Sequence, residues 1–267
     1  MSDTASVDDS ATLKLGRALH HIHCLDRAIA EHLAQRPMRL MSRYDNQKRE
    51  LTHFIDQKEN VPAFIALTVG DAIHNLRAAL DHVIWAMIGD KARNAWSVQF
   101  PFARSQADLE DAIQKREIAL AGQRVVDVIR QLKPFDGGNR LLYALNKLDV
   151  EDKHKLISAT VGTGELDANQ TAEIFPNYGV RTDTRLIFSA GTVITMQGVP
   201  PGAIDGWMTR QAMRIFEYPR PNQPQFQVAF GDPGPMAGTP LVDGLMKMYA
   251  EVGKAVELLT HACAADD

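Results

Sequence analysis

Apolar residues recur at steps of three and four over long stretches of the first half of the chain, which predicts amphipathic helices. A first helix is expected over residues 12–33, and Pro37 ends it. A second, more polar helix is expected over residues 38–58. Asn60, as N-cap, and Pro62, in the first turn, then open a third helix that runs to about Ile88. Gly70 lies inside this third helix, where it marks a kink or a point of close packing.

The helical period continues, with interruptions, to about residue 154 and returns at the end of the chain. Ser105 caps a stretch that breaks near Gly122 and ends before Pro134. A fifth helix follows from about Leu141 to His154, and a final helix begins after Pro240. The last helix has a clear apolar stripe, which we expect to be buried against the N-terminal helices.

Between residues 156 and 238 the pattern changes to short segments rich in β-branched and aromatic residues, bounded by Gly, Pro, Asn and Asp. In the last of them Phe226, Val228 and Phe230 alternate with less apolar neighbours, as in a half-exposed antiparallel strand. The expected strands cover residues 157–161, 173–175, 185–188, 192–196, 213–218 and 225–230. Together they predict a small antiparallel sheet.

These patterns predict an α+β protein that is mainly α. We expect a disordered tail over residues 1–11 and an antiparallel helical bundle over residues 12–155. A small β-rich segment, residues 156–238, is then inserted before a C-terminal helix, residues 239–267, that packs back on the bundle.

Composition and charge are those of a globular protein. The 267 residues are 45% hydrophobic and 23% charged, which excludes disorder of the whole chain. The net charge of -4 gives no overall attraction to nucleic acid, so a nucleic-acid site needs a local basic surface. No apolar run approaches the roughly 20 residues that cross a bilayer. With two separated cysteines and no export signal at the start, we expect a cytoplasmic protein without a membrane partner.

The most informative chemistry lies on the third predicted helix, within residues 70–89. His74, Arg77 and Asp81 are three and four residues apart and therefore share one ridge of the helix. Asp71 lies one turn earlier, and His82 joins the same polar side. An imidazole, a guanidinium and a carboxylate together suit acid–base and anion chemistry, and they also suit an ordinary network of salt bridges.

The stretch Arg77-Ala-Ala-Leu-Asp-His82 resembles the R-x4–6-H signature of the HEPN superfamily, whose helical bundles include metal-independent ribonucleases. The resemblance implies a dimer in which these residues meet their symmetry mates and act on an RNA phosphodiester. It implies His82 as the proton-transfer group and Arg77 as the residue that stabilises phosphate charge.

A wider resemblance links the chain to a family of bacterial helical proteins. This resemblance implies no particular activity. It rests on the Gly-Asp-x-x-His-Asn-Leu-Arg-x-Ala-Leu-Asp-His stretch at residues 70–82, on Phe100-Pro101, and on Asp152-Lys153-His154.

A second polar cluster ends the fifth predicted helix, at residues 149–154. If the third and fifth helices are neighbours, Asp152 or His154 faces His74 and Asp81, and the set could bind ligand or a divalent metal. Alternatively, Asp149 pairs with Lys153 and the cluster only complements the end of its helix.

Three functions remain open from the residues. The first is a metal-independent ribonuclease or a phosphodiester- or nucleotide-binding protein, with RNA or a nucleotide as ligand and no cofactor. Its catalytic candidates are His74, Arg77, Asp81 and His82, and its binding candidates are Asp71, Asp152 and His154. The second is a non-catalytic, homo-oligomeric interaction or structural protein, in which the ridge is a polar network. The third is a metal-dependent hydrolase with a His/Asp site between helices.

Overall fold

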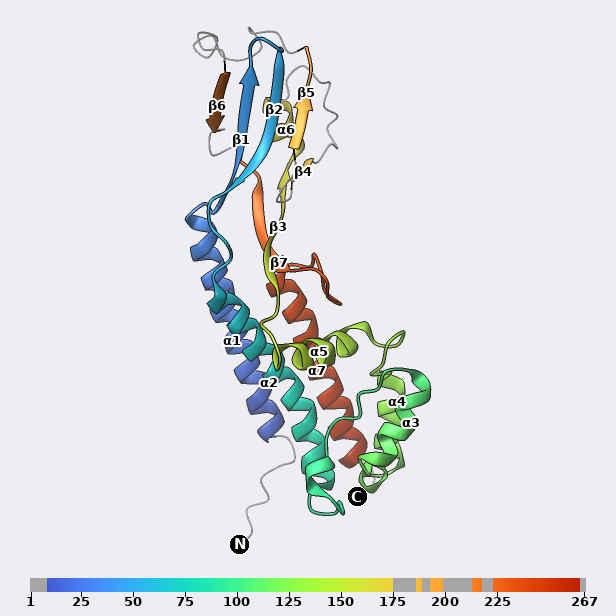
Figure 1. The fold of residues 1–267 in the computed structure, drawn as a ribbon. Coiled ribbons are helices and arrows are strands. Elements are labelled where there is room, and N and C mark those ends of the chain that lie inside the picture. The colour runs from blue at the N-terminus through green and yellow to red at the C-terminus, as the bar shows by residue number, and fades with distance from the viewer. Residues whose placement is uncertain (1–8, 175–185, 189–192, 199–212, 218–222, 265–267) are drawn as a thin grey trace. The chain divides into compact units, whose positions relative to one another are not determined.

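The computed structural model describes residues 9–174, 186–188, 193–198, 213–217 and 223–264. Its helices and short antiparallel strands confirm a mainly α protein of the α+β class, as the course of the chain in Figure 1 shows. The chain divides into two compact units. Unit 1 comprises residues 1–28, 63–158 and 230–267, and unit 2 comprises residues 29–62 and 159–229.

Unit 1 is helical. Its central helix, α2 (Ala63–Ile88), packs against α5 (Arg140–Asp152) and α7 (Leu241–Ala264), and α7 also contacts α4 (Gln123–Leu132). The apolar stripe of α2 is buried, with Ile73, Leu76, Leu80 and Ile84 inaccessible to solvent. Burial of one such side chain contributes about 1.5–3 kcal/mol, so this stripe fixes which side of α2 faces outward. The first helix, α1 (Asp9–Ala34), places Ala18, Ile22 and Leu25 in the core.

Local capping sets where the shorter helices of unit 1 begin. The side chain of Ser105 caps α3 (Gln106–Lys115), as predicted, and the 3-10 turns η1 (Ala95–Ser97) and η2 (Ile118–Ala121) connect the helices around it. Asn139 caps α5, because its Oδ1 accepts hydrogen bonds from the Leu141 and Leu142 amides at 3.1 and 3.2 Å. This cap fixes the start of the helix that carries half of the candidate site.

Unit 2 contains two antiparallel sheets rather than the single small one expected. The four-stranded sheet has the order β5-β2-β1-β6, and the three-stranded sheet has the order β4-β3-β7. The short helix α6 (Ala168–Ile174) follows β3. The strands are β1 (Met38–Asp45), β2 (Glu50–Gln57), β3 (Ala159–Leu166), β4 (Leu186–Phe188), β5 (Val193–Met196), β6 (Met213–Glu217) and β7 (Gln225–Phe230).

The helix expected over residues 38–58 is wrong, because this segment forms the β1–β2 hairpin. Buried and less buried positions alternate along β1, which is the period of a strand and not of a helix. The turn is made by Asp45, whose Oδ1 accepts hydrogen bonds from the Gln47 and Lys48 amides. Arg49 completes it in the left-handed region, with φ of 52°. A helical bundle over residues 12–155 is therefore interrupted by two strands that belong to unit 2.

Other boundaries differ by smaller amounts. The expected tail ends earlier, because α1 begins at Asp9 and buries Ala11; residues 1–8 lie outside the described part. The strand expected at 173–175 is wrong for its first two residues, which belong to α6, and its third lies outside the described residues. The strand expected at 225–230 coincides with β7.

Within the described residues, no helix combines the length and the apolar character that crossing a bilayer would need.

Candidate functional site

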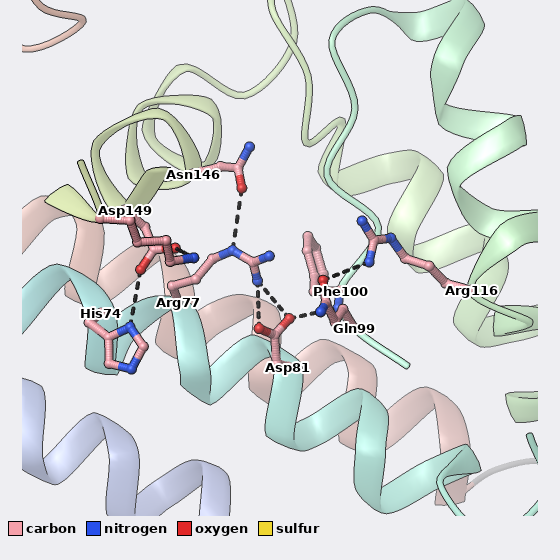
Figure 2. A network of polar contacts seen from close by, with 9 residues as sticks. His74, Arg77, Asp81, Gln99, Phe100, Arg116, Asn146 and Asp149 are labelled. Atoms are coloured by element: carbon pink, nitrogen blue, oxygen red, sulfur yellow. Dashed lines mark hydrogen bonds and ion pairs between the residues drawn. The ribbon is translucent and has the colours of Figure 1, made fainter. Parts of the chain in front are cut away.

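The polar ridge of α2 meets α5 and the segment that follows η1, all within unit 1 (Figure 2). The third and fifth predicted helices are thus neighbours, as the sequence reasoning required. The three ridge residues do not bind one another as a group. His74 turns to α5, whereas Arg77 and Asp81 bind each other.

His74 is oriented by a buried carboxylate of α5. Its Nδ1 lies 3.2 Å from Asp149 Oδ1, and the other Asp149 oxygen accepts a hydrogen bond from Lys153 Nζ at 2.7 Å. The Asp149 side chain is 4% exposed, whereas the side chains of His74 and Lys153 are 61% and 57% exposed. Because an ionised carboxylate can only accept, Nδ1 of His74 is the donor in this contact, which in a neutral imidazole leaves the lone pair on Nε2. We call this set the His74–Asp149–Lys153 cluster.

Arg77 is held on several sides. Its Nη1 lies 2.6 and 2.7 Å from the two oxygens of Asp81, and its Nε donates to Asn146 Oδ1 of α5 at 3.3 Å. The guanidinium also lies over the Phe102 ring, 4.6 Å from the centroid. With only 11% of its side chain exposed, Arg77 joins α2 to α5 and to the 99–102 segment.

Asp81 extends this network to the segment after η1. Its Oδ1 also accepts a hydrogen bond from the Phe100 amide at 2.8 Å, which fixes the backbone at the start of a segment with two buried phenylalanines, Phe100 and Phe102. The next residue back, Gln99, accepts a hydrogen bond from Arg116 at 2.9 Å. Burial and the nearby Arg77 charge lower the pKa of Arg116, and Asp81 opposes this shift. The pair Arg77–Asp81 therefore positions the surrounding chain.

His82 lies on a different side of α2 from Arg77. Five residues at about 100° each separate the two by roughly 140° around the helix. Burial and the Lys14 ammonium of α1 lower the pKa of His82, while Asp81 raises it. The contacts of Arg77 in the described part of the chain are with Asp81, Asn146 and Phe102, so within one copy of the chain it does not pair with His82.

Asp71 contacts α1 rather than the rest of the ridge. Its Oδ2 lies 4.0 Å from His21 Nδ1, and burial lowers the pKa of His21 more than Asp71 raises it. Asp152 lies near these charges: burial, Asp149 and Asp71 raise its pKa, and His74 opposes the shift.

The α5 residue that hydrogen-bonds His74 is Asp149, while Asp152 lies close enough to His74 for their charges to interact. His154, which follows α5, lines a cavity that also includes Asn146. The simpler alternative, that Asp149 pairs with Lys153, is confirmed, but the same carboxylate also binds His74. Among the described residues, no group of three or more His, Cys, Asp and Glu side chains is arranged to hold a metal ion.

A second hydrogen-bonded histidine, His53 of unit 2, was not predicted from the sequence. Ser42 of β1 and His53 of β2 are directly opposite in the hairpin, with Oγ and Nδ1 2.7 Å apart and both residues inaccessible to solvent. Burial lowers the pKa of His53 to about 4. The pair is too deeply buried to reach a substrate, so we assign it to the hairpin core.

No family model, curated protein or solved structure matches the chain. The interpretation of the site therefore rests on its own geometry.

Sequence reasoning missed Asn146, and it named Asp149 only as the partner of Lys153, not as the partner of His74. With Lys153 they follow one another at steps of three and four, so a polar ridge on the fifth helix was readable. The spacing of residues along a helix does not predict how α5 is rotated about its axis. This rotation determines that the polar ridge of α5 meets the ridge of α2.

Proposed function

We propose that the protein is a metal-independent, RNA-directed phosphodiesterase in which His74 is the acid–base group. One observation carries the proposal: a buried Asp149 carboxylate binds an exposed imidazole through one oxygen and an exposed ammonium through the other. A carboxylate in this position fixes the tautomer of the imidazole and leaves Nε2 free to take a proton.

The two exposed members of the cluster suit a phosphodiester. In the proposed step, His74 Nε2 takes the proton of a ribose 2′-hydroxyl, and the resulting oxygen attacks the adjacent phosphorus. The bond from phosphorus to the 5′ oxygen breaks, water protonates that oxygen, and a 2′,3′-cyclic phosphate remains. Lys153 offsets the charge on the non-bridging oxygens.

The open position of the cluster supports a large substrate. His74 and Lys153 stand at the surface, where an RNA strand has access that an enclosed cavity would deny. The proposal keeps the chemistry implied by the HEPN resemblance and changes the residue roles. Arg77 becomes a positioning residue, because Asp81, Asn146 and Phe102 already occupy its guanidinium.

The test is cleavage of a labelled single-stranded RNA by the full chain in the presence of a chelator. We expect products that end in a 2′,3′-cyclic phosphate, and no cleavage of the matching DNA, which lacks the 2′-hydroxyl. His74→Gln should reduce the rate by about 100-fold or more, in the range of lost acid–base catalysis. The matched control is His23→Gln, an exposed histidine of α1 that should retain the full rate.

Three results would overturn the proposal. Cleavage that stops with chelator and returns with a divalent ion would favour the metal-dependent alternative. A rate that depends on His82 and not on His74 would favour the residue roles implied by the HEPN motif. Absence of any RNA cleavage, with a folded protein, would favour a non-catalytic interaction protein.

A further inference from the structure

A cavity of about 870 Å³ lies in unit 1 between α5 and the segment around Phe102. Its volume is within the range of about 300–1,000 Å³ that is usual for small-molecule sites. Asn146 belongs to its wall and accepts the hydrogen bond from Arg77, so the cavity adjoins the ridge. The cavity is also lined by Phe102, Arg104, Tyr143, Lys147, Val150 and His154.

Part of the wall is apolar. Val150, a large apolar residue in the last turn of α5, is 49% exposed, and Phe102 and Tyr143 line the same cavity. An exposed apolar surface beside an aromatic ring is the kind of wall against which a planar base packs.

The rest of the wall offers positive charge. Lys155 forms an ion pair with Glu151, their charged atoms 3.1 Å apart. Arg104 and Lys147 have no ion-pair partner within the described part of the chain, and both are exposed. The one other carboxylate in the lining is that of Asp136. Two unpaired cations beside an apolar wall match a ligand that has an anionic group and a flat, largely apolar group.

We propose that this cavity binds a nucleoside phosphate, with the base against Tyr143 and Val150 and the phosphate at Arg104 and Lys147. This inference names a binding site for the substrate of the proposed function. It rests on that function, because it treats the bound nucleotide as one residue of an RNA strand. On α5, Asp149 and Lys153 stand beside the face that carries Asn146 and Val150, so a strand bound in the cavity continues toward the His74–Asp149–Lys153 cluster.

The test is calorimetric titration of the full chain, in separate experiments, with adenosine 5′-monophosphate, with adenosine and with inorganic phosphate. We expect the monophosphate to bind more tightly than either fragment, because it alone contacts both parts of the wall. Lys147→Ala and Arg104→Ala should each weaken monophosphate binding about tenfold, the usual effect of losing one charge-assisted contact. Val150→Ser removes apolar surface without adding charge, so it should weaken monophosphate binding and leave phosphate binding less affected. Lys91→Ala, at an exposed lysine outside the cavity, is the matched control.

The outcomes separate this inference from the proposed function. Monophosphate binding that is unchanged in both Lys147→Ala and Arg104→Ala, or no saturable binding, overturns the inference, even if RNA is cleaved. Binding that is lost in these variants but retained in His74→Gln supports it. If that pattern is found while no RNA is cleaved, the cavity assignment stands and the proposed catalysis fails.

Discussion

The Asp152 carboxylate of α5 lies directly against Gly70 of α2. A Cβ built on Gly70 would come within 2.4 and 2.5 Å of the two Asp152 oxygens, closer than such atoms approach. The sequence marked Gly70 as a kink or a close-packing point, and the structure confirms the second interpretation. Burial raises the pKa of Asp152, and so do the charges of Asp149, three residues earlier on α5, and of Asp71, next to Gly70 on α2.

We expect Asp152→Asn to stabilise the protein at neutral pH. A raised pKa in the folded state means that the folded protein binds this proton more tightly than the unfolded chain does. The protonated carboxyl of Asp152 makes its full contribution to stability below the ordinary pKa of 3.8. This contribution is lost as pH rises through the folded pKa. Asparagine removes the charge, so the urea midpoint should rise at pH 7 and stay unchanged near pH 3. Asp90→Asn, at an exposed position, is the control, and a lower midpoint for Asp152→Asn at pH 7 would refute the argument.

Asp81→Ala should destabilise unit 1 strongly. It leaves the largely buried Arg77 guanidinium without its carboxylate and the Phe100 amide without its acceptor. Loss of one partner of a buried pair costs about 3–5 kcal/mol; because the Asp81 side chain is 28% exposed, we expect a value near the lower end. Denaturant unfolding followed by tryptophan fluorescence measures this loss.

Two further variants check the reason for that loss. The double variant Arg77→Leu with Asp81→Leu removes both charges, and it should be more stable than Asp81→Ala alone. Asp111→Ala, at an exposed aspartate of α3, should change stability by less than about 0.5 kcal/mol. A similarly small effect of Asp81→Ala would show that the pair does not hold α2 to its neighbours.

Acid should weaken the β1–β2 hairpin through His53. Its folded pKa of about 4 lies below the unfolded value of 6.5, so the unfolded chain binds the proton first as pH falls. Stability is complete above about pH 6.5 and decreases toward pH 4, where the loss reaches about 3 kcal/mol. Hydrogen exchange of the β1 and β2 amides at pH 7 and pH 4.5 measures this loss directly.

Replacement of the histidine separates its titration from other effects of acid. In His53→Gln the difference in protection between pH 7 and pH 4.5 should shrink, whereas in His261→Gln, an exposed histidine of α7, it should persist. If His53→Gln keeps the full difference, another group is responsible.

The sequence predicted the helices of unit 1 well because each has one apolar stripe with one period. Along α2 the stripe that includes Ile73, Leu76 and Leu80 has no competing strand pattern. The prediction for residues 38–58 failed because the apolar residues there fit both the helical period and the strand period. Leu40 and Tyr44, four residues apart, suit a helix and a strand equally. The deciding signal was the turn at Asp45, where a side chain binds the following amides.

The candidate site was predicted in part. Spacing alone placed His74, Arg77 and Asp81 on one ridge, and the pairing of Arg77 with Asp81 is a local contact between residues four apart. The contact of His74 with Asp149 depends on how two helices rotate against each other. That rotation is set by burial along their whole length, which the local spacing on either helix does not contain.

The tautomer of His74 tests the central claim most directly, because the proposed base exists only if Asp149 holds the Nδ1 proton. Two-bond ¹H–¹⁵N NMR of the full chain, under conditions in which the imidazole is neutral, distinguishes the two neutral tautomers. We predict the Nδ1-protonated form in the natural protein and a loss of that preference in Asp149→Asn. A proton on Nε2 in the natural protein, or the same tautomer in both proteins, would contradict the account.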